Sequence, residues 1–251
     1  MLAHETTGSG TPLLLIHGLT ESRRMWDPLI PALAEDHAVL AVDLPGHGES
    51  GPAASYAMGV MADEVATVVR SIGMDAPTVV GHSLGGVVAT AYAAAHPSRS
   101  VVNVDQSLAL RDFKGALASI EPQLRGDEAT FLAVLTAMFD AMEAPLSPAE
   151  CARLEALRRI DKRVVLAIWA PVMEASAAEL DALVRSFAGQ VTVPYLALHG
   201  SDPGADYTAW LSDVIPQATM EVWPDHGHYP HLVEPDRFID RLRDFEAAAQ
   251  A

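Results

Sequence analysis

The chain has only one cysteine, Cys151, and no long apolar run. A single cysteine cannot form an internal disulfide and argues against a cysteine-rich zinc site. No stretch approaches the ~20 uninterrupted apolar residues that span a bilayer. The amino terminus also lacks the basic start and apolar segment of a signal peptide. We therefore expect a cytoplasmic protein.

Basic residues are scarce as well. The sequence has 16 Lys and Arg against 33 Asp and Glu, for a formal net charge of −17. Binding of nucleic acid needs clustered Lys and Arg to neutralise phosphates, and anionic membrane surfaces attract the same residues. The composition therefore predicts no nucleic-acid partner and no membrane partner, and the acidic surface favours solubility.

Short apolar runs alternate with segments of helical periodicity at both ends of the chain. The expected strands are 11–17, 38–42, 78–80, 101–104, 195–199 and 220–223. Helical segments are expected between them, including one after the first strand. Such alternation predicts βαβ units, and therefore an α/β fold with a mostly parallel, doubly wound sheet.

The alternation stops between residues 108 and 190, where the sequence shows no convincing strand. Ser147 and Ser176 are each followed three residues later by glutamate, the pattern of a capping box at a helix start. We predict one core domain, residues 1–107 and 191–251, with an all-helical lid, residues 108–190, inserted into it.

A candidate nucleophile lies in Gly81-His82-Ser83-Leu84-Gly85, which has the form G-x-S-x-G. The motif falls between an expected strand and an expected helix, which is the setting of a nucleophile elbow. Gly81 and Gly85 are the small residues that such a tight turn needs. We predict that Ser83 is the nucleophile; the alternative is that it only caps the helix beginning at Leu84.

A tetrahedral oxyanion needs two hydrogen-bond donors, preferably backbone N–H groups. The N–H of Leu84, directly after the nucleophile, is one candidate. The N–H of Leu19 is the other, because His17-Gly18 ends the first expected strand and glycine permits a close approach.

The general base is expected among the histidines that follow the last expected strand. We predict His228, because Gly227 before it permits a sharp approach. His226 is the second choice, and His231 is expected to face the lid or solvent. No carboxylate–histidine ligand set is evident on a regular element, so we expect no metal and no cofactor.

The histidine needs a carboxylate to fix its tautomer, and aspartates follow two of the expected strands. Asp202 follows strand 195–199 and is the preferred prediction, with Asp105, after strand 101–104, as the alternative. Asp206 is a weaker third candidate. Both strand ends are expected at the same edge of the sheet, so either carboxylate can reach the histidine.

Four motifs together resemble the α/β-hydrolase superfamily, in particular its small lidded esterases, lactonases and haloperoxidase-like members. The motifs are His17-Gly18-Leu19-Thr20, Asp43-Leu44-Pro45-Gly46-His47-Gly48-Glu49-Ser50, Gly81-His82-Ser83-Leu84-Gly85-Gly86, and Gly227-His228 followed by Glu234-Pro235. The resemblance covers essentially the whole chain. Epoxide hydrolases and haloalkane dehalogenases share the layout but have aspartate at the position of Ser83.

Two features depart from the pattern of that superfamily. Its acid usually stands three residues after the strand-end glycine, whereas Asp202 stands two after Gly200. This keeps Asp105 open, since some relatives carry the acid at the earlier strand. The usual opening hairpin also looks truncated, because only 2–6 precede the first apolar strand.

These residues predict a serine hydrolase that cleaves a carboxylic ester or lactone of a small to medium apolar substrate through an acyl-enzyme. A cofactor-free perhydrolase or haloperoxidase, or a C–C bond hydrolase, would use the same triad. A lyase on the same scaffold would depend on His228 more than on an acyl-enzyme. From another class, a ligand-binding receptor could keep the triad and turn over almost nothing.

Overall fold

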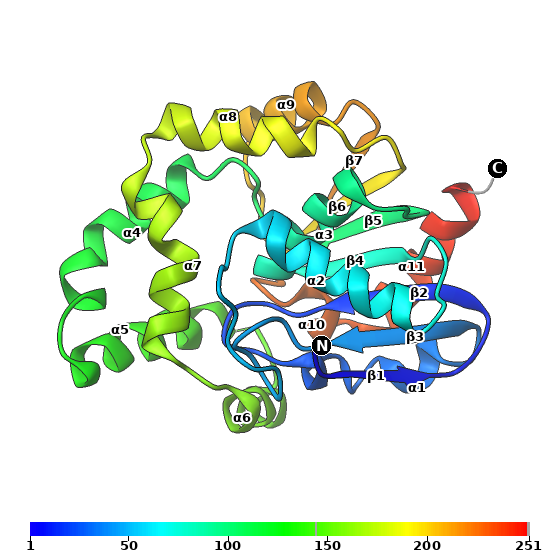
Figure 1. Cartoon of the computed structure of the whole chain (residues 1–251), viewed down its shortest axis with the longest axis horizontal. Helices are drawn as coiled ribbons and strands as arrows, with labels where there is room; N and C mark the ends of the chain where they lie inside the picture. The colour runs from blue at the N-terminus through cyan, green and yellow to red at the C-terminus, as the bar shows by residue number, and fades with distance from the viewer. Residues whose placement is uncertain (144, 250–251) are drawn as a thin grey trace.

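A seven-stranded sheet forms the centre of the computed structural model, which describes residues 1–143 and 145–249 (Figure 1). The strand order is β1-β3-β2-β4-β5-β6-β7, and only β1 runs antiparallel within the described chain. The strands are β1 His4–Thr7, β2 Thr11–Ile16, β3 His37–Val42, β4 Thr78–His82, β5 Ser100–Val104, β6 Tyr195–His199 and β7 Ala218–Val222. The predicted fold class is confirmed.

Both faces of the sheet are covered, which explains why its strands read as continuous apolar runs. Within β2, Leu14 and Ile16 belong to one buried cluster, while Leu13 and Leu15 belong to the other. The helices outside the insertion are η1 Arg23–Trp26, α1 Ile30–Leu33, α2 Met58–Ser71, α3 Leu84–Ala95, α9 Ala205–Val214, α10 Pro230–Val233 and α11 Pro235–Ala249. Figure 1 shows α2 and α3 on one face and α1 and α11 on the other.

The register of the parallel strands fixes where their connecting loops emerge. Ile16 of β2 pairs with Gly81 of β4, which pairs with Asn103 of β5, which pairs with Ala197 of β6. The loops that follow these four strands therefore leave the sheet at one edge. Ligand sites of open parallel sheets lie at this carboxyl edge.

In the described part of the segment between β5 and β6 there are five helices, where the sequence predicted a helical insertion (Figure 1). They are α4 Arg111–Leu124, α5 Glu128–Glu143, α6 Pro148–Leu157, α7 Lys162–Glu174 and α8 Ala177–Ala188. The capping box at Ser176 forms in both directions with Glu179. The Ser147 side chain accepts a hydrogen bond from the Glu150 N–H. The Glu150 carboxylate accepts from Arg153 instead of from the Ser147 N–H.

Two local features differ from the sequence prediction. The edge strand β1 was not predicted, because His4-Glu5-Thr6-Thr7 is polar and has no apolar side to signal burial. The helix expected after the first strand is reduced to the short elements η1 and α1. Within the described ranges, no helix combines the length and the apolar character needed to cross a bilayer.

Candidate active site

Ser83 stands in a sharp turn between β4 and α3, as the motif predicted. Its backbone has φ 51° and ψ −123°, in a region that L-residues rarely occupy. The turn requires both flanking glycines: a Cβ on Gly81 would lie 2.0 Å from the carbonyl oxygen of Gly85, and a Cβ on Gly85 would lie 2.3 Å from that of Ile16. The Ser83 N–H donates to the carbonyl of Val104 at 3.0 Å, which fastens the turn to β5.

The side chain of Ser83 makes no capping hydrogen bond to α3 in the described structure. The alternative that Ser83 serves only as a helix cap therefore finds no support in the geometry. The residue is half-buried. Because it lies between β4 and α3, it stands at the carboxyl edge of the sheet and at the start of a helix. The partial positive charge of a helix start favours developing negative charge there.

The loop after β2 approaches Ser83 closely, and His17 sets its orientation. The Leu44 N–H donates to His17 Nε2 at 3.0 Å, so Nδ1 carries the hydrogen and donates to the Gly18 carbonyl at 2.7 Å. Burial lowers the pKa of His17, in agreement with this neutral form. Because the peptide between Gly18 and Leu19 is trans, the Leu19 N–H points away from His17.

A Cβ placed on Gly18 would lie 3.2 Å from the Ser83 Cβ, so the two loops are in contact. Neither the Leu19 N–H nor the Leu84 N–H donates a backbone hydrogen bond to a residue that the structure describes. Two free amides beside a serine are the donors that an oxyanion requires.

His228 is held by Asp105. The distance from His228 Nδ1 to Asp105 Oδ2 is 2.7 Å, and the second carboxylate oxygen accepts the Gly200 N–H at 2.8 Å. Since a carboxylate can only accept, Nδ1 carries the hydrogen, and in the neutral form of the ring the lone pair is on Nε2. Burial opposes ionisation of Asp105, but its bonds to His228 and Gly200 outweigh burial and hold the pKa of Asp105 below its ordinary value.

This pairing corrects the preferred sequence prediction of Asp202. Asp202 is exposed, and its Oδ1 accepts the N–H of Gly204 at 2.8 Å within its own turn. Asp206 is also exposed, in the first turn of α9. A Cβ on Gly200 would lie 1.9 Å from the Gly227 carbonyl, so the strand-end backbone fills the space beside the histidine loop.

The other two histidines of the loop lie elsewhere. His226 Nδ1 lies 2.7 Å from the Pro224 carbonyl oxygen. The expectation that His231 faces the lid or solvent is wrong: His231 is fully buried and lies against the ring of Trp26, with ring centroids 4.9 Å apart. Burial lowers its pKa well below the usual value, so it stays neutral. Among the described residues no group of three His, Cys, Asp or Glu side chains could hold a metal ion.

Sequence reasoning missed two charged residues beneath the site, Glu21 and His82. Both are buried, and their side chains meet with His82 Nδ1 3.2 Å from Glu21 Oε2. The residues are 61 positions apart, and nothing in the pattern of either segment signals the pairing. The only available hint was position: Glu21 directly follows the motif that ends at Thr20, and His82 stands directly before Ser83.

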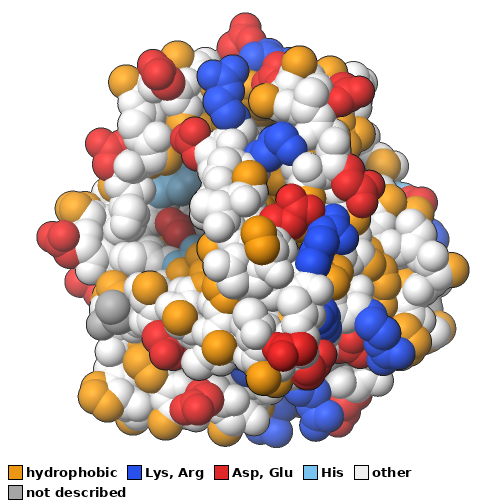
Figure 2. Space-filling model, turned by 90° about the vertical axis from the view of Figure 1, so that its left-hand side faces the viewer, with side chains coloured by type: hydrophobic (Ala, Val, Ile, Leu, Met, Phe, Trp, Pro, Cys, Tyr) orange, Lys and Arg blue, Asp and Glu red, His pale blue; other side chains and the backbone are white. Residues whose placement is uncertain are grey.

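The insertion meets both loops of the site. The Arg159 N–H donates to the Thr20 carbonyl at 3.0 Å, and a Cβ on Gly227 would lie 2.7 Å from the Pro145 ring. On the face formed by the insertion, Figure 2 shows a hollow with histidine and acidic side chains at its floor.

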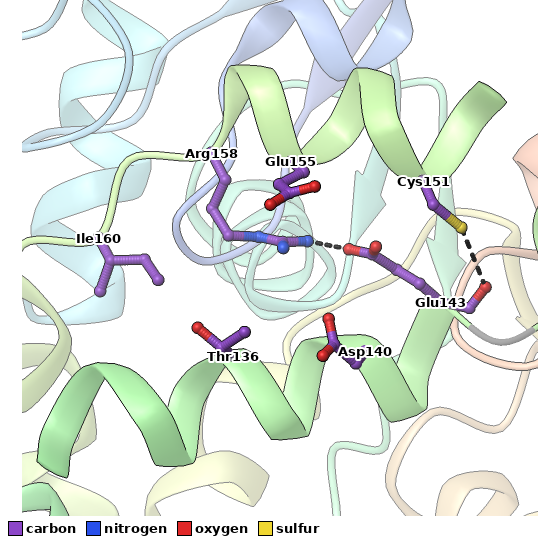
Figure 3. A pocket seen from close by; sticks show the side chains of 7 residues that line it. All are labelled: Thr136, Asp140, Glu143, Cys151, Glu155, Arg158 and Ile160. Carbon is purple, nitrogen blue, oxygen red and sulfur yellow. Dashed lines mark hydrogen bonds and ion pairs between the residues drawn. The ribbon is translucent and has the colours of Figure 1, made fainter. Parts of the chain in front are cut away.

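A separate cavity of about 220 Å3 lies within the insertion (Figure 3). It is lined by Thr136, Asp140, Glu143, Cys151, Glu155, Arg158 and Ile160. The guanidinium of Arg158 pairs with Glu143 and lies 4.3 Å from the centre of the Phe139 ring. Its charge is thus already neutralised, and the lining includes neither Ser83 nor His228.

Comparison with known proteins gives a consistent result. A family model described as the alpha/beta hydrolase family matches residues 13–241. A pimeloyl-[acyl-carrier protein] methyl ester esterase of Photobacterium profundum is 29% identical, covering 97% of this chain and 98% of that protein. A 2-(acetamidomethylene)succinate hydrolase of Mesorhizobium japonicum is 28% identical over 95% of this chain and 88% of its own length. The solved structure of an esterase from Rhodococcus has a TM-score of 0.79 and 27% identity, covering 99% of this chain and 95% of that one.

Proposed function

This chain belongs to the α/β-hydrolase family, and from that premise we propose that it is a serine hydrolase whose triad is Ser83, His228 and Asp105. The broader prediction, an ester-cleaving hydrolase, is confirmed by the family match and by the esterases among the relatives. The observation that carries the triad is the bond between His228 and Asp105 at the strand edge that presents Ser83.

The first half of the reaction forms an acyl-enzyme. The Ser83 hydroxyl attacks the carbonyl carbon of the ester while His228 Nε2 takes its proton. The N–H groups of Leu19 and Leu84 stabilise the oxyanion, and Asp105 stabilises the imidazolium that forms. The tetrahedral intermediate collapses, and His228 gives the proton to the departing alcohol.

The second half returns the enzyme to its starting state. Water attacks the acyl carbon, and His228 takes one of its protons. The bond to the Ser83 oxygen breaks, the serine regains a proton from His228, and the carboxylic acid leaves. No group beyond these side chains and amides is required, so we expect no cofactor.

We assign residues 108–190 as a lid over the site, inserted into a core of residues 1–107 and 191–251. The contacts of Arg159 with Thr20 and of Pro145 with Gly227 support this assignment, because they bring the insertion against both the oxyanion loop and the base loop. A lid excludes water and strengthens the electrostatic interactions within the site.

We propose a small or medium apolar ester or lactone as substrate. The insertion supplies partly buried apolar side chains, among them Phe113, Met138 and Met142, which suit an apolar acyl group. The relative from Photobacterium profundum is named for a methyl ester, so methyl esters belong in the test series. The cytoplasmic location, and the absence of nucleic-acid and membrane partners, remain predictions from composition.

The test is hydrolysis of p-nitrophenyl and methyl esters, from acetate to decanoate, by the wild-type protein and Ser83→Ala. We expect turnover by the wild type and a loss on the order of 10⁶-fold in kcat for the variant. Ser201→Ala is the matched control, because Ser201 is exposed and follows β6, two strands away from β4 in the same sheet. Full activity of Ser83→Ala would overturn the proposal.

A further inference from the structure

The His82 side chain connects two loops of the site from below. It is fully buried; its Nδ1 lies 3.2 Å from Glu21 Oε2 and its Nε2 lies 2.9 Å from the carbonyl oxygen of His228. An ionised carboxylate and a backbone carbonyl can only accept hydrogen bonds. With Glu21 ionised, both ring nitrogens carry hydrogen, and His82 is an imidazolium.

Glu21 has a second contact that explains why it is ionised. The same oxygen that faces His82 accepts the N–H of Gly18 at 2.7 Å. Burial disfavours its charge, but the neighbouring His82 reverses this and holds the pKa of Glu21 well below its ordinary value. Conversely, burial opposes protonation of His82, and the Glu21 carboxylate outweighs it and raises the pKa of His82.

The pair therefore reaches three loops that the reaction uses. Glu21 holds Gly18, whose peptide carries the Leu19 N–H. His82 is the residue directly before Ser83, and its Nε2 holds the backbone of His228. The proposed reaction steps do not use the side chains of Glu21 and His82. Stability does not explain the pair either, since replacing a buried ion pair by apolar residues is often neutral or stabilising.

We propose that Glu21 and His82 form a positioning pair, which fixes the oxyanion loop and the base loop relative to Ser83. The inference rests on the proposed function. Neither residue touches the substrate; the ion pair acts through Gly18 and His228. A misplacement of about 1 Å can cost ~100-fold in rate, so the loss of either bond is expected to lower kcat.

Aromatic and titratable side chains surround His82. The rings of His228, Tyr229 and His231 lie 4.7, 4.7 and 4.8 Å from its own. Burial keeps His231 neutral and raises the pKa of the Tyr229 hydroxyl far above its usual value. Asp105 faces the cluster from β5 as the second carboxylate.

The decisive experiment compares His82→Gln with His82→Asn. The glutamine amide reaches the position of Nε2 and keeps a donor for His228, whereas the asparagine amide reaches the position of Nδ1 and keeps a donor for Glu21. We expect about 10- to 100-fold lower kcat for His82→Asn and a smaller loss for His82→Gln, with KM changed less than about threefold in both. Both variants lose the charge, and asparagine is one methylene smaller than glutamine, so the stability of each is measured alongside kcat. A merely structural role predicts losses of kcat that follow the losses of stability.

Glu21→Gln supplies an independent variant that changes only charge and donor pattern. A neutral His82 can donate from only one nitrogen, so this variant should also lose about 10- to 100-fold in kcat. Glu246→Gln is the matched control, because Glu246 pairs with His37 at 2.7 Å on another part of the sheet. It should change stability and leave kcat within twofold.

The rate at which a fluorophosphonate modifies Ser83 is measured alongside ester turnover, because it reports the base and the oxyanion loop without a natural substrate. If the wild type neither turns over esters nor reacts at Ser83, the proposed function fails and this inference fails with it. If the wild type reacts, but folded Glu21→Gln and both His82 variants match it within twofold, only the positioning role is overturned. Losses of kcat in His82→Gln and His82→Asn that follow their losses of stability would overturn it as well.

Discussion

The sheet carries a buried histidine–glutamate pair at each of its two ends. At the amino end, His37 begins β3 and meets Glu246 of α11 at 2.7 Å. At the carboxyl end, His82 closes β4 and meets Glu21 at 3.2 Å. Burial opposes protonation of both histidines, and in each case the bonded carboxylate outweighs it and raises the pKa.

The two pairs differ in what their second hydrogen bond holds. His37 Nδ1 lies 3.0 Å from the Leu33 carbonyl, at the end of a short helix of the core, and 2.6 Å from a carboxylate oxygen of Asp36. His82 Nε2 lies 2.9 Å from the carbonyl of His228. The same interaction thus fastens a helix to the sheet at one end and orients the proposed catalytic base at the other. The two pairs have the same residue types. The backbone group that each histidine bonds distinguishes a structural pair from a positioning pair.

Backbone strain is concentrated at the carboxyl end. Four of the five described non-glycine residues with positive φ follow β2, β4, β5 and β7 there: Thr20 at 64°, Ser83 at 51°, Asp105 at 52° and Asp225 at 65°. The fifth, Ala76 at 37°, lies just before β4 at the amino end. Such conformations cost of order 1–3 kcal/mol each and persist only where the surroundings enforce them. The carboxyl end is therefore where a weakened network should reduce function first.

The largest effect on kcat should come from replacing, one at a time, the two aspartates that the sequence offered as candidate acids. Asp105→Asn leaves His228 with the wrong tautomer and should lower kcat about 10⁴-fold. Asp202→Asn affects only an exposed turn and should leave kcat within twofold. The measurement is steady-state ester hydrolysis by both variants, and the reverse order of losses would restore Asp202 as the acid.

The next largest effect should come from alkaline pH, which should weaken both pairs but lower kcat only through His82. The pKa values of folded His37 and His82 lie above the unfolded value of about 6.5, so the stabilisation is complete below about pH 6.5 and is lost as pH rises through the raised values. Deprotonation of His82 should also lower kcat about tenfold or more, because one of its two bonds is lost. In Glu21→Gln this alkaline fall of kcat should move to lower pH, because the carboxylate that raises the pKa of His82 is gone. An unchanged profile in Glu21→Gln would argue against the role of His82.

The smallest effect on activity should come from the amino end. Glu246→Gln weakens the bond to His37 and should lower the free energy of unfolding by about 1–3 kcal/mol. Denaturant unfolding measures that loss, while kcat and its alkaline fall should match those of the wild type. A substantial drop in kcat would mean that the two ends of the sheet are coupled.

The positions of several candidate residues were predictable because these residues stand at fixed places in local motifs. Ser83, Gly81 and Gly85 follow from a turn that excludes side chains, and His228 from a glycine before it. The aspartate that bonds His228 was not predictable, because β5 and β6 are neighbours and an aspartate follows each of them at the same edge. The backbone at Gly200 favours Asp105 over Asp202, because the Gly200 N–H donates a hydrogen bond to the Asp105 carboxylate.

The fold shows the same division. Strands buried on both faces are continuous apolar runs and were predicted, whereas the polar edge strand β1 was not. The helical insertion was visible as a loss of strand signal. The ion pair between Glu21 and His82 could not be inferred, because burial and proximity across the sheet leave no trace in the spacing of charged residues.

The central claim is that Ser83 is a nucleophile activated by His228. The most direct test is mass spectrometry of the intact protein and its peptides after reaction with a fluorophosphonate. We predict one phosphonyl group per chain, on Ser83, and none in Ser83→Ala under the same conditions. Modification of another residue, or equal modification of Ser83→Ala, would contradict the claim.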